Sequence, residues 1–144
     1  MGPAGAGKTV ALRDVYHRTG APLLNVNLEL SRRMLELTER QRALQLPRIL
    51  AEIVDASATD LPAPQSGAAR QAGVVLLDNI EILFDVSLKQ DPLRLLQGLS
   101  RNKTVVATWG GVIAGGYLVY ATPDHSEYRR YPARDLIAIE AYRE

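Results

Sequence analysis

The sequence predicts an α/β fold with a mostly parallel sheet, and three observations point to it. Short apolar segments of strand character alternate with longer segments of helical periodicity, the order typical of a parallel sheet covered by helices. Val74–Leu77 is a continuous apolar run closed by Asp78, as expected of a strand buried on both faces. A glycine-rich segment, Gly2–Thr9, leads directly into the first helical pattern.

The first half of the chain predicts a helix, a strand and then further helices. The helix runs from Lys8 to about Thr19, and the strand covers Leu23–Asn27. Residues 31–55 have a helical pattern in two pieces, which we expect to divide at Pro47 because proline interrupts a helix. Residues 56–73 mix Ala, Pro, Ser and Gly without periodicity and predict a mobile surface loop.

The second half predicts further strands around one short helix. After the Val74–Asp78 strand, Asp91–Arg101 has the pattern of a helix capped by its aspartate, with proline at the first helical position. Thr104–Thr108 predicts another buried strand, and Tyr117–Ala121 and Leu136–Ala141 are also strand-like.

Composition indicates one globular domain over residues 1–144, with 47% apolar and 23% charged residues. A formal net charge of +1 does not indicate a general polyanion binder. The absence of cysteine excludes disulfides and thiolate metal sites, and two histidines cannot form a histidine metal cluster. No apolar run approaches the ~20 residues of a membrane span, so we expect a cytoplasmic protein with no membrane contact.

The segment Gly2–Thr9 reads Gly-Pro-Ala-Gly-Ala-Gly-Lys-Thr and matches G-x-x-x-x-G-K-[ST], the phosphate-binding loop of the three-layer P-loop NTPase fold. Its glycines let successive backbone N–H groups face one anion, and the helix that follows adds its positive dipole end. The predicted ligands are therefore ATP and Mg²⁺. The expected nucleotide-binding residues are Gly2, Gly5, Ala6, Gly7, Lys8 and Thr9.

Within this site, Lys8 is expected to reach the β- and γ-phosphates, and the Thr9 hydroxyl to ligate Mg²⁺. Asp78 ends a buried strand, as the Walker B carboxylate of such proteins does, and is the second predicted Mg²⁺ residue. Asn79 occupies the place of the usual catalytic glutamate, which leaves Glu81 as the nearest carboxylate that could orient water. Thr108, ending the next strand, is the candidate γ-phosphate sensor. The predicted catalytic set is thus Lys8, Asp78, Glu81 and Thr108.

The carboxyl ends of parallel strands share one edge, so we expect Asn27, Asp78 and Thr108 to converge on Gly7–Thr9. Neighbouring polar residues, Asn25, Asn27 and Glu29, are candidates to contact metal-bound water or a partner.

Several other residues have two interpretations. Trp109 packs either in the core or on a nucleotide base, and Arg101 either reaches a neighbouring subunit's γ-phosphate or complements its own helix dipole. Tyr128–Tyr131 interleaves aromatic and cationic residues, which suits either a strand edge or single-stranded nucleic acid. An ion-paired, solvated helix face is predicted from the i, i+4 spacing of Arg32, Glu36 and Arg40.

The run Leu77–Phe84, continuing through Ser87–Leu96, closely resembles the BrxF family, the P-loop proteins of type 3 bacteriophage exclusion (BREX) systems. Asn25–Ser31, Val106–Trp109 and Tyr128–Pro132 match as well, so the resemblance covers nearly the whole chain. It implies a small ATPase-like component of a bacterial antiviral defence system that also includes a DNA methyltransferase, a phosphatase-like protein and a larger ATPase. Its implied partners are other BREX components and further copies of itself, with DNA contacted indirectly.

The family's phosphate-binding loop carries over to Gly2, Gly7, Lys8 and Thr9, and its Walker B aspartate to Asp78. Family members have a first strand running into the loop, whereas no strand precedes it here, so we expect a chain truncated at its amino terminus. In such folds that strand is central. We therefore predict a gap in the middle of the sheet, reduced stability and weak ATP binding.

The predicted function is that of a Mg-ATP-binding ATPase. One alternative is a scaffold that binds ATP without hydrolysing it, because Asn79 replaces the usual glutamate. A small-molecule kinase is a second alternative, disfavoured if the Thr104–Thr108 strand lies between the loop strand and the Asp78 strand. A GTPase is disfavoured because Asn102–Val105 lacks the aspartate that would bind guanine.

Overall fold

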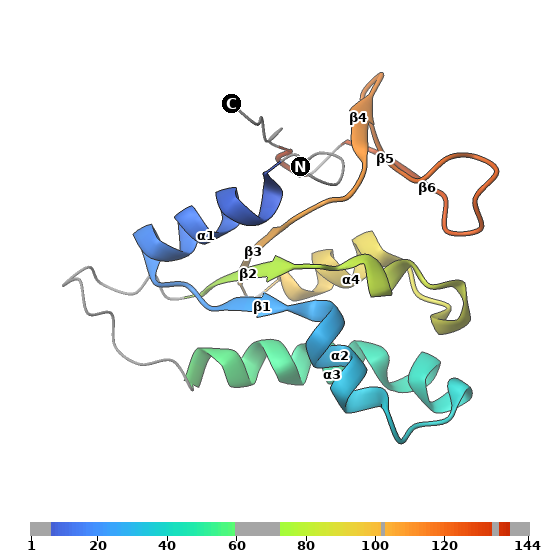
Figure 1. Cartoon of the computed structure of the whole chain (residues 1–144), viewed down its shortest axis with the longest axis horizontal. Coiled ribbons are helices and arrows are strands. Elements are labelled where there is room, and N and C mark those ends of the chain that lie inside the picture. Colours follow the sequence, from blue (N-terminus) through green and yellow to red (C-terminus); the bar gives the residue numbers. More distant parts are fainter. Residues whose placement is uncertain (1–6, 60–72, 102, 134–135, 139–144) are drawn as a thin grey trace.

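The computed structural model describes residues 7–59, 73–101, 103–133 and 136–138, and Figure 1 shows its arrangement. It is a mixed α/β protein with a three-stranded parallel sheet, as the sequence predicts. The strands are β1 (Leu23–Asn25), β2 (Val74–Asp78) and β3 (Thr104–Ala107).

These three strands pair in the order β1-β2-β3, so the gap predicted inside the sheet is not found between them. The register places Asn25 opposite Asp78, and Leu77 opposite Ala107, so the carboxyl ends of the strands meet at one edge. The unpaired positions are instead the two outer edges of the sheet, on β1 and on β3, where no strand of the described part of the chain pairs.

Helices cover both faces of this sheet (Figure 1). On one face α1 (Lys8–Thr19) packs Leu12 against Leu76 of β2. On the other, α2 (Val26–Met34) and α3 (Glu39–Thr59) form the main core with the β2 residues Val75 and Leu77. Alternate side chains of β2 therefore serve two cores, which explains why its sequence is apolar throughout.

The boundaries of α1 follow from glycine. Gly7 precedes the helix at φ +84° and Gly20 follows it at φ +68°, both in the left-handed region that glycine adopts without steric cost. The backbone N–H of Gly20 donates to the Tyr16 carbonyl oxygen at 2.8 Å, ending the helix at Thr19 as predicted.

Prediction and structure differ in the helices that follow. The strand predicted over Leu23–Asn27, β1, stops at Asn25, because the Asn25 side chain caps α2 by accepting a hydrogen bond from the Leu28 N–H at 3.1 Å. The break between α2 and α3 falls at residues 35–38, not at Pro47. Thr38 and Gln41 exchange side-chain to backbone hydrogen bonds of 3.0 and 3.2 Å, a capping box that starts α3.

Pro47 lies on the exposed side of α3, which continues without interruption for 21 residues. The stabilisation from burying one face of α3, with Leu46, Leu50 and Val54, is larger than the cost of the single hydrogen bond that Pro47 cannot donate. The helix extends through Thr59, so the first four residues of the predicted 56–73 loop are helical. The remainder of that loop, apart from Gly73, lies outside the described residues.

The second half of the chain follows the prediction more closely. After two 3₁₀ turns, η1 (Glu81–Phe84) and η2 (Val86–Leu88), Asp91 caps α4 (Pro92–Leu99) by accepting from the Arg94 N–H at 3.3 Å. Pro92 takes the first helical position, as expected.

A second, antiparallel sheet contains β4 (Val112–Ala114), β5 (Tyr117–Tyr120) and β6 (Arg129–Pro132). The β4–β5 hairpin turns on Gly115 and Gly116, both at positive φ as such two-residue turns require. The strand predicted over Leu136–Ala141 is not formed in its described part, residues 136–138.

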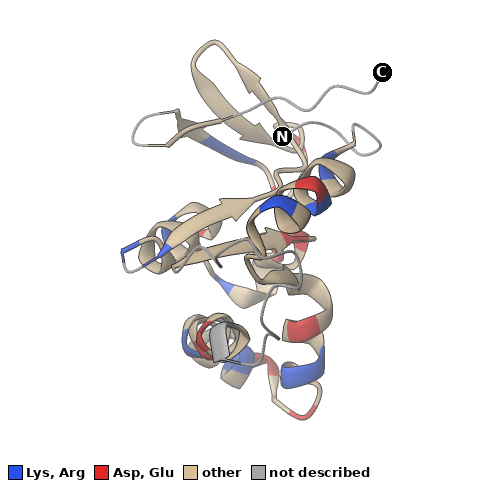
Figure 2. Cartoon of the chain, turned by 90° about the vertical axis from the view of Figure 1, so that its left-hand side faces the viewer, with Lys and Arg blue, Asp and Glu red and all other residues tan. Residues whose placement is uncertain are grey.

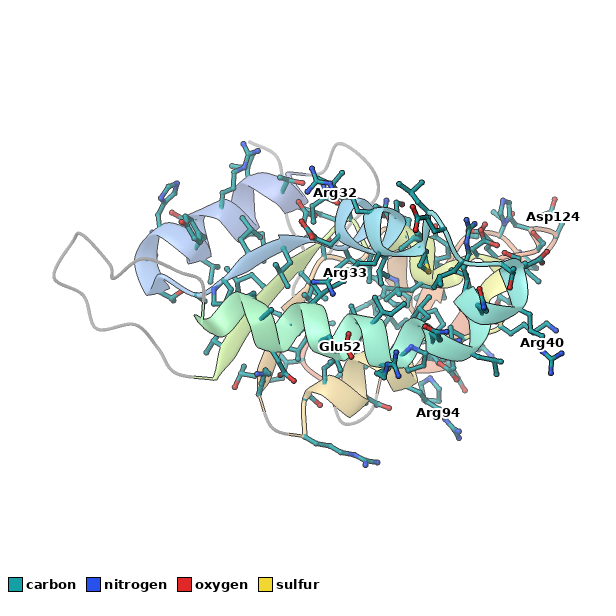
Figure 3. All side chains as sticks on the ribbon, turned by 90° about the horizontal axis from the view of Figure 1, so that it is seen from below. Arg32, Arg33, Arg40, Glu52, Arg94 and Asp124 are labelled. Carbon is teal, nitrogen blue, oxygen red and sulfur yellow. The ribbon has the colours of Figure 1, made fainter. Side chains whose placement is uncertain are left out.

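Charged residues are distributed among the helices, and Figure 2 shows basic and acidic positions interspersed, as on α1. The predicted Arg32, Glu36, Arg40 ladder is not formed. Arg32 instead pairs with Glu29 at 3.6 Å, on the underside shown in Figure 3. Such an exposed pair contributes little to stability. No described helix has both the length and the apolar character needed to cross a membrane.

Candidate functional site

Three polar side chains from separate elements meet at the carboxyl edge of the parallel sheet. Asp78 ends β2 and is 8% exposed. Its Oδ2 accepts a hydrogen bond of 2.9 Å from the Thr9 hydroxyl, in the first turn of α1. Its Oδ1 accepts 2.9 Å from the buried Thr108 hydroxyl and 3.0 Å from the Asn79 N–H. The predicted convergence of Thr9, Asp78 and Thr108 is confirmed as geometry.

This cluster, Thr9–Asp78–Thr108, depends on how the strands pair. Thr108 directly follows β3, and its backbone N–H donates to the Leu77 carbonyl at 3.0 Å, continuing the ladder one residue beyond the strand. That bond holds Thr108 beside Asp78 although 30 residues separate them. Because the Thr9 and Thr108 hydroxyls both donate to Asp78, their protons point toward its carboxylate. Both hydroxyl oxygens therefore keep lone pairs that can bind another ligand.

The Gly7 turn lies beside this cluster because it leads into Lys8 and Thr9. Gly7 has no side chain to cap α1, and the first turn of the helix carries no acidic residue. The positive end of the helix dipole is thus left without a side-chain counter-charge from its own first turn. Gly2, Gly5 and Ala6, the other predicted phosphate ligands, lie outside the described residues.

Asn27 holds the loop that follows β2, a role the sequence did not reveal. Its backbone N–H donates to the Asn79 carbonyl at 2.9 Å, and its side-chain oxygen accepts from the Ile82 N–H at 2.8 Å. Asn27 therefore clamps both ends of the turn that carries Glu81. Asn25 and Glu29, predicted alongside it as candidate contacts, instead cap a helix and pair with Arg32.

Asn79 has a conformational reason to stand where a glutamate was expected. Its φ is +53°, and asparagine enters the left-handed region more readily than most residues with a Cβ. A glutamate would be strained there. The backbone of this turn thus favours asparagine directly after Asp78.

Glu81 begins η1 and faces the second sheet. One of its carboxylate oxygens lies 3.6 Å from the point where a Cβ would stand on Gly110. Glu81 also helps raise the pKa of Tyr120, after the larger effects of burial and of Glu127. Among the described residues no hydrogen bond joins Glu81 to the Thr9–Asp78–Thr108 cluster.

Trp109 belongs to the core, which confirms the first of its two interpretations. It is 5% exposed and its indole N–H donates to the Val119 carbonyl at 3.0 Å. Phe84 stacks on Tyr120 at a centroid separation of 3.7 Å, and Trp109 meets both rings edge-on. These rings connect the segment after Thr108 to the second sheet.

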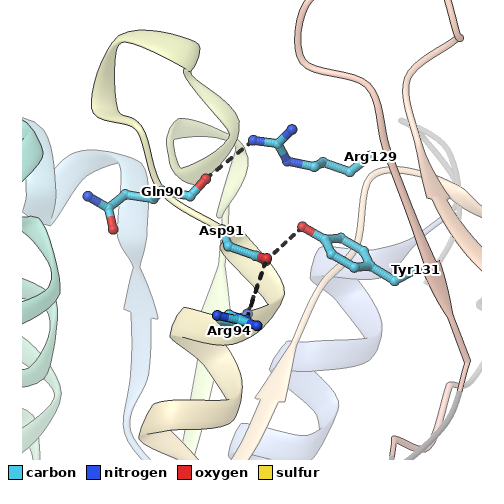
Figure 4. Close-up of polar contacts among 5 residues, drawn as sticks. All are labelled: Gln90, Asp91, Arg94, Arg129 and Tyr131. Carbon is cyan, nitrogen blue, oxygen red and sulfur yellow. Dashed lines mark hydrogen bonds and ion pairs between the residues drawn. The ribbon is translucent and has the colours of Figure 1, made fainter.

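The Tyr128–Tyr131 segment is used inside the chain. Arg129 donates to the Gln90 carbonyl at 3.3 Å and Tyr131 donates to Asp91 Oδ1 at 2.9 Å, as Figure 4 shows. Arg130 lies 3.5 Å from the ring centroid of Tyr117. Burial, and then the bond to Asp91, raise the pKa of Tyr131 to about 12. Residues 129–132 form β6, which lies at the edge of the second sheet, as the strand-edge interpretation expects. Arg101 is exposed beyond α4.

The donor set of the cluster fits Mg²⁺, a hard cation that prefers oxygen ligands and commonly takes one or two carboxylates together with substrate phosphates and water. Thr9 and Asp78 would hold it. Among the described residues no group of three or more His, Cys, Asp or Glu side chains is arranged to hold a metal ion.

Comparisons with protein-family models, with curated proteins and with solved structures found no match to this chain.

Proposed function

We propose that this chain is a Mg-ATP-binding protein of the P-loop NTPase class that hydrolyses ATP. The observation that carries the proposal is the Thr9–Asp78–Thr108 cluster, next to the uncapped, glycine-preceded start of α1. A hydroxyl in the first helical turn, hydrogen-bonded to a buried carboxylate that ends a neighbouring strand, is what a phosphate-bound magnesium ion requires of the protein.

In this proposal each residue has a role that follows from its position. The backbone N–H groups after Gly7 and the Lys8 ammonium bind the β- and γ-phosphates. Bound Mg²⁺ would neutralise phosphate charge, held by the Thr9 hydroxyl and by Asp78. Thr108, whose hydroxyl donates to Asp78, would contact the γ-phosphate.

Hydrolysis then needs a water molecule in line with the bond that breaks. Glu81 orients the water and accepts its proton as the water oxygen attacks the γ-phosphorus. The bond to the β–γ bridging oxygen breaks, and ADP and inorganic phosphate leave. Asn27 supports this step indirectly, because it holds the turn from Asn79 to Ile82.

A scaffold that binds ATP without hydrolysing it is the second candidate, and one observation favours it. Glu81 faces Gly110 and Tyr120 rather than Asp78, so the carboxylate must turn to reach a water at the γ-phosphate. The kinase alternative depends on which strand separates the loop strand from β2, and the described residues fix only that β3 pairs directly with β2 and that Thr108, directly after β3, lies beside Asp78.

The cellular role we propose follows from the sequence resemblance to BREX proteins. The chain would act in a bacterial antiviral defence complex, where its nucleotide state controls assembly with other components and, through them, with DNA.

The test compares ATP binding and ADP release in wild type, Lys8→Ala, Thr9→Ala and Thr9→Ser, titrated to millimolar ATP with Mg²⁺. We expect Lys8→Ala and Thr9→Ala to lose binding or turnover by at least about tenfold, and Thr9→Ser, which keeps the hydroxyl, to retain most of it. Arg13→Ala, exposed on the same helix, is the matched control. Equal binding by wild type and Lys8→Ala would remove the proposal.

A single-turnover comparison of wild type with Glu81→Gln separates the two candidates. Retained binding with a rate lowered about a hundredfold supports hydrolysis through Glu81. An unchanged rate excludes Glu81 as the base, and no ADP from either protein supports the scaffold.

A further inference from the structure

The second sheet has one face that packs on the core and one that does not. Cross-strand pairing places Ile113, Leu118 and Tyr131 in one row, and these side chains pack in or against the main core. The alternate positions face the other way, because successive side chains of a strand point to opposite faces of its sheet. The residues of this outer face are Val112, Ala114, Tyr117, Val119, Arg130 and Pro132.

The outer face is apolar where a solvated face would be polar. An antiparallel sheet with one face in water normally alternates apolar residues inward with polar residues outward. Here every outward residue except Arg130 is apolar or aromatic, and none of them belongs to the two described core clusters. Val112 is 47% exposed, and Figure 1 shows the second sheet projecting beyond the parallel sheet and its helices. Apolar surface gathered on one face marks an interaction site.

Arg130 carries the charge of the outer face, and its guanidinium is held in place. The central guanidinium carbon lies 3.5 Å from the ring centroid of Tyr117, on the middle strand β5. A guanidinium stacked on an aromatic ring is attracted to the ring face and keeps the N–H donors on its edge free. Within the described chain no ion pair or side-chain hydrogen bond joins this guanidinium to another residue. The face therefore presents an oriented, unpaired cation among apolar side chains.

The charge of this region specifies the chemistry of the occupant. One arginine complements one carboxylate, whereas nucleic acid or an anionic membrane is attracted by several cations together. Residues 109–133 carry no net formal charge, because their two arginines are balanced by Asp124 and Glu127. Arg129, the second arginine, donates to a backbone carbonyl inside the chain. The face thus complements an apolar surface that carries a single acidic side chain.

The dimensions of the face specify the shape of the occupant. At about 4.8 Å between strands and about 3.3 Å per residue, the second sheet spans roughly 10 Å by 13 Å. A stable interface between two folded proteins buries about 800 Å² on each, several times this area. An α-helix is about 10 Å wide and packs on the face of a sheet, whereas an extended segment pairs at its edge. About two turns of one helix therefore match the outer face.

We propose that the outer face of the second sheet binds an amphipathic helix of a partner protein, in which an aspartate or glutamate lies between two apolar residues, one turn away on either side. The carboxylate pairs with Arg130, and the apolar residues pack on Val112, Val119 and Pro132. Paired N–H···O bonds between arginine and carboxylate fix the position of the helix on the sheet. The inference rests on this sheet alone, and it stands whether or not the chain binds ATP.

The experiment selects peptides from a phage-displayed library of helical peptides of about 14 residues, randomised along one helix face, against the whole chain without nucleotide. We expect the selected peptides to carry an acidic residue between two apolar ones. The most enriched peptide, synthesised with a fluorescent label, should bind Arg130→Glu at least about tenfold more weakly than wild type. With its acid replaced by arginine, the same peptide should prefer Arg130→Glu to wild type. No enrichment on wild type, or selected peptides without an acid, would overturn the proposal.

A second variant tests the apolar part of the face independently of the charge. Val112→Lys, on β4, should also weaken binding of the peptide at least about tenfold, because it places a cation on the apolar surface. Arg101→Glu and Val10→Lys make the same changes at exposed positions on other elements and should bind the peptide as wild type does. Thermal melting of each variant checks that it is folded.

Three results would contradict the assignment. One is an equal loss of peptide binding in the two control variants. Another is binding of a poly-dT oligonucleotide that Arg130→Glu abolishes, the result expected of a nucleic-acid site. The third is self-association that Arg130→Glu abolishes, the result expected if a second copy covers the face.

Discussion

Two aspartates, Asp78 and Asp91, make similar contacts in different surroundings. Each accepts a hydrogen bond of 2.9 Å from a hydroxyl group far away in the sequence, Asp78 from Thr108 and Asp91 from Tyr131. Asp78 is buried at the edge of the parallel sheet, beside the uncapped start of α1. Asp91 is exposed, caps α4 and fastens the second sheet to it.

Hydrogen bonding alone therefore does not identify a functional carboxylate. Both hydroxyl partners of Asp78, Thr9 and Thr108, retain acceptor lone pairs. Asp91 Oδ1 accepts from both the Tyr131 hydroxyl and the Arg94 N–H, and these contacts hold the second sheet and cap α4. We therefore expect changes at the two aspartates to affect different properties.

The largest effect is expected from Asp78→Asn compared with Asp91→Asn. Losing the charge at Asp78 should lower kcat for ADP release by about a hundredfold or more, because the proposed Mg²⁺ would lose its anionic ligand. Asp91→Asn retains a good helix cap and should leave kcat within about twofold. Steady-state rates with saturating Mg-ATP measure both. Similar losses in the two variants would break the distinction.

An intermediate effect is expected from Asn27→Ala compared with Asn25→Ala. Removing the Asn27 side chain leaves the Ile82 N–H without its acceptor and should lower the free energy of unfolding by about 1–2 kcal/mol. Because the turn carrying Glu81 is then loosened, kcat should fall about tenfold with little change in KM. Asn25→Ala removes a helix cap at a cost of about 1 kcal/mol and should leave kcat unchanged. Urea denaturation and turnover measurements on each variant distinguish positioning from stability.

The smallest expected effect is a pH dependence of stability that comes from Tyr131, the hydroxyl partner of Asp91. The pKa of Tyr131 is raised to about 12 in the folded protein, from an ordinary value of 10. The folded state therefore keeps its proton in a range where the unfolded state has lost it, and stability should fall as pH rises from about 10 to 12. Burial also raises the pKa of Tyr120, so wild type must be compared with Tyr131→Phe. The variant should show a shallower decline in Tm, and parallel curves would refute the assignment.

Much of the parallel sheet could be predicted because its signals are local. A continuous apolar run indicated β2, and the Asp91-Pro92 pair marked the start of α4. The α2–α3 boundary was predicted at Pro47 but lies at residues 35–38. The sequence did contain a signal for it, because Thr38 and Gln41 have the spacing of a capping box. Core packing along α3 overrides the cost of that proline.

The site residues also differ in whether their contacts could be predicted from local signals. The motif and the strand ends indicated that Thr9, Asp78 and Thr108 would meet, because parallel strands end at one edge. Nothing local indicated that Asn27 would clamp the following turn, since its partners are 52 and 55 residues away. The contact of Tyr131 with Asp91, 40 residues away, could not be predicted for the same reason.

By itself, the sequence determined the α/β class, the start of α1 at a glycine-rich turn and the chemical identity of the residues at the sheet edge. These follow from backbone preferences and apolar patterning, which act over a few neighbouring residues. Only the tertiary structure decided that β3 lies at an open edge over an apolar groove, that Asn79 adopts a left-handed conformation, and that Glu81 faces the second sheet. Those outcomes depend on which distant segments pack together, and the free energy of that packing is not contained in any one segment.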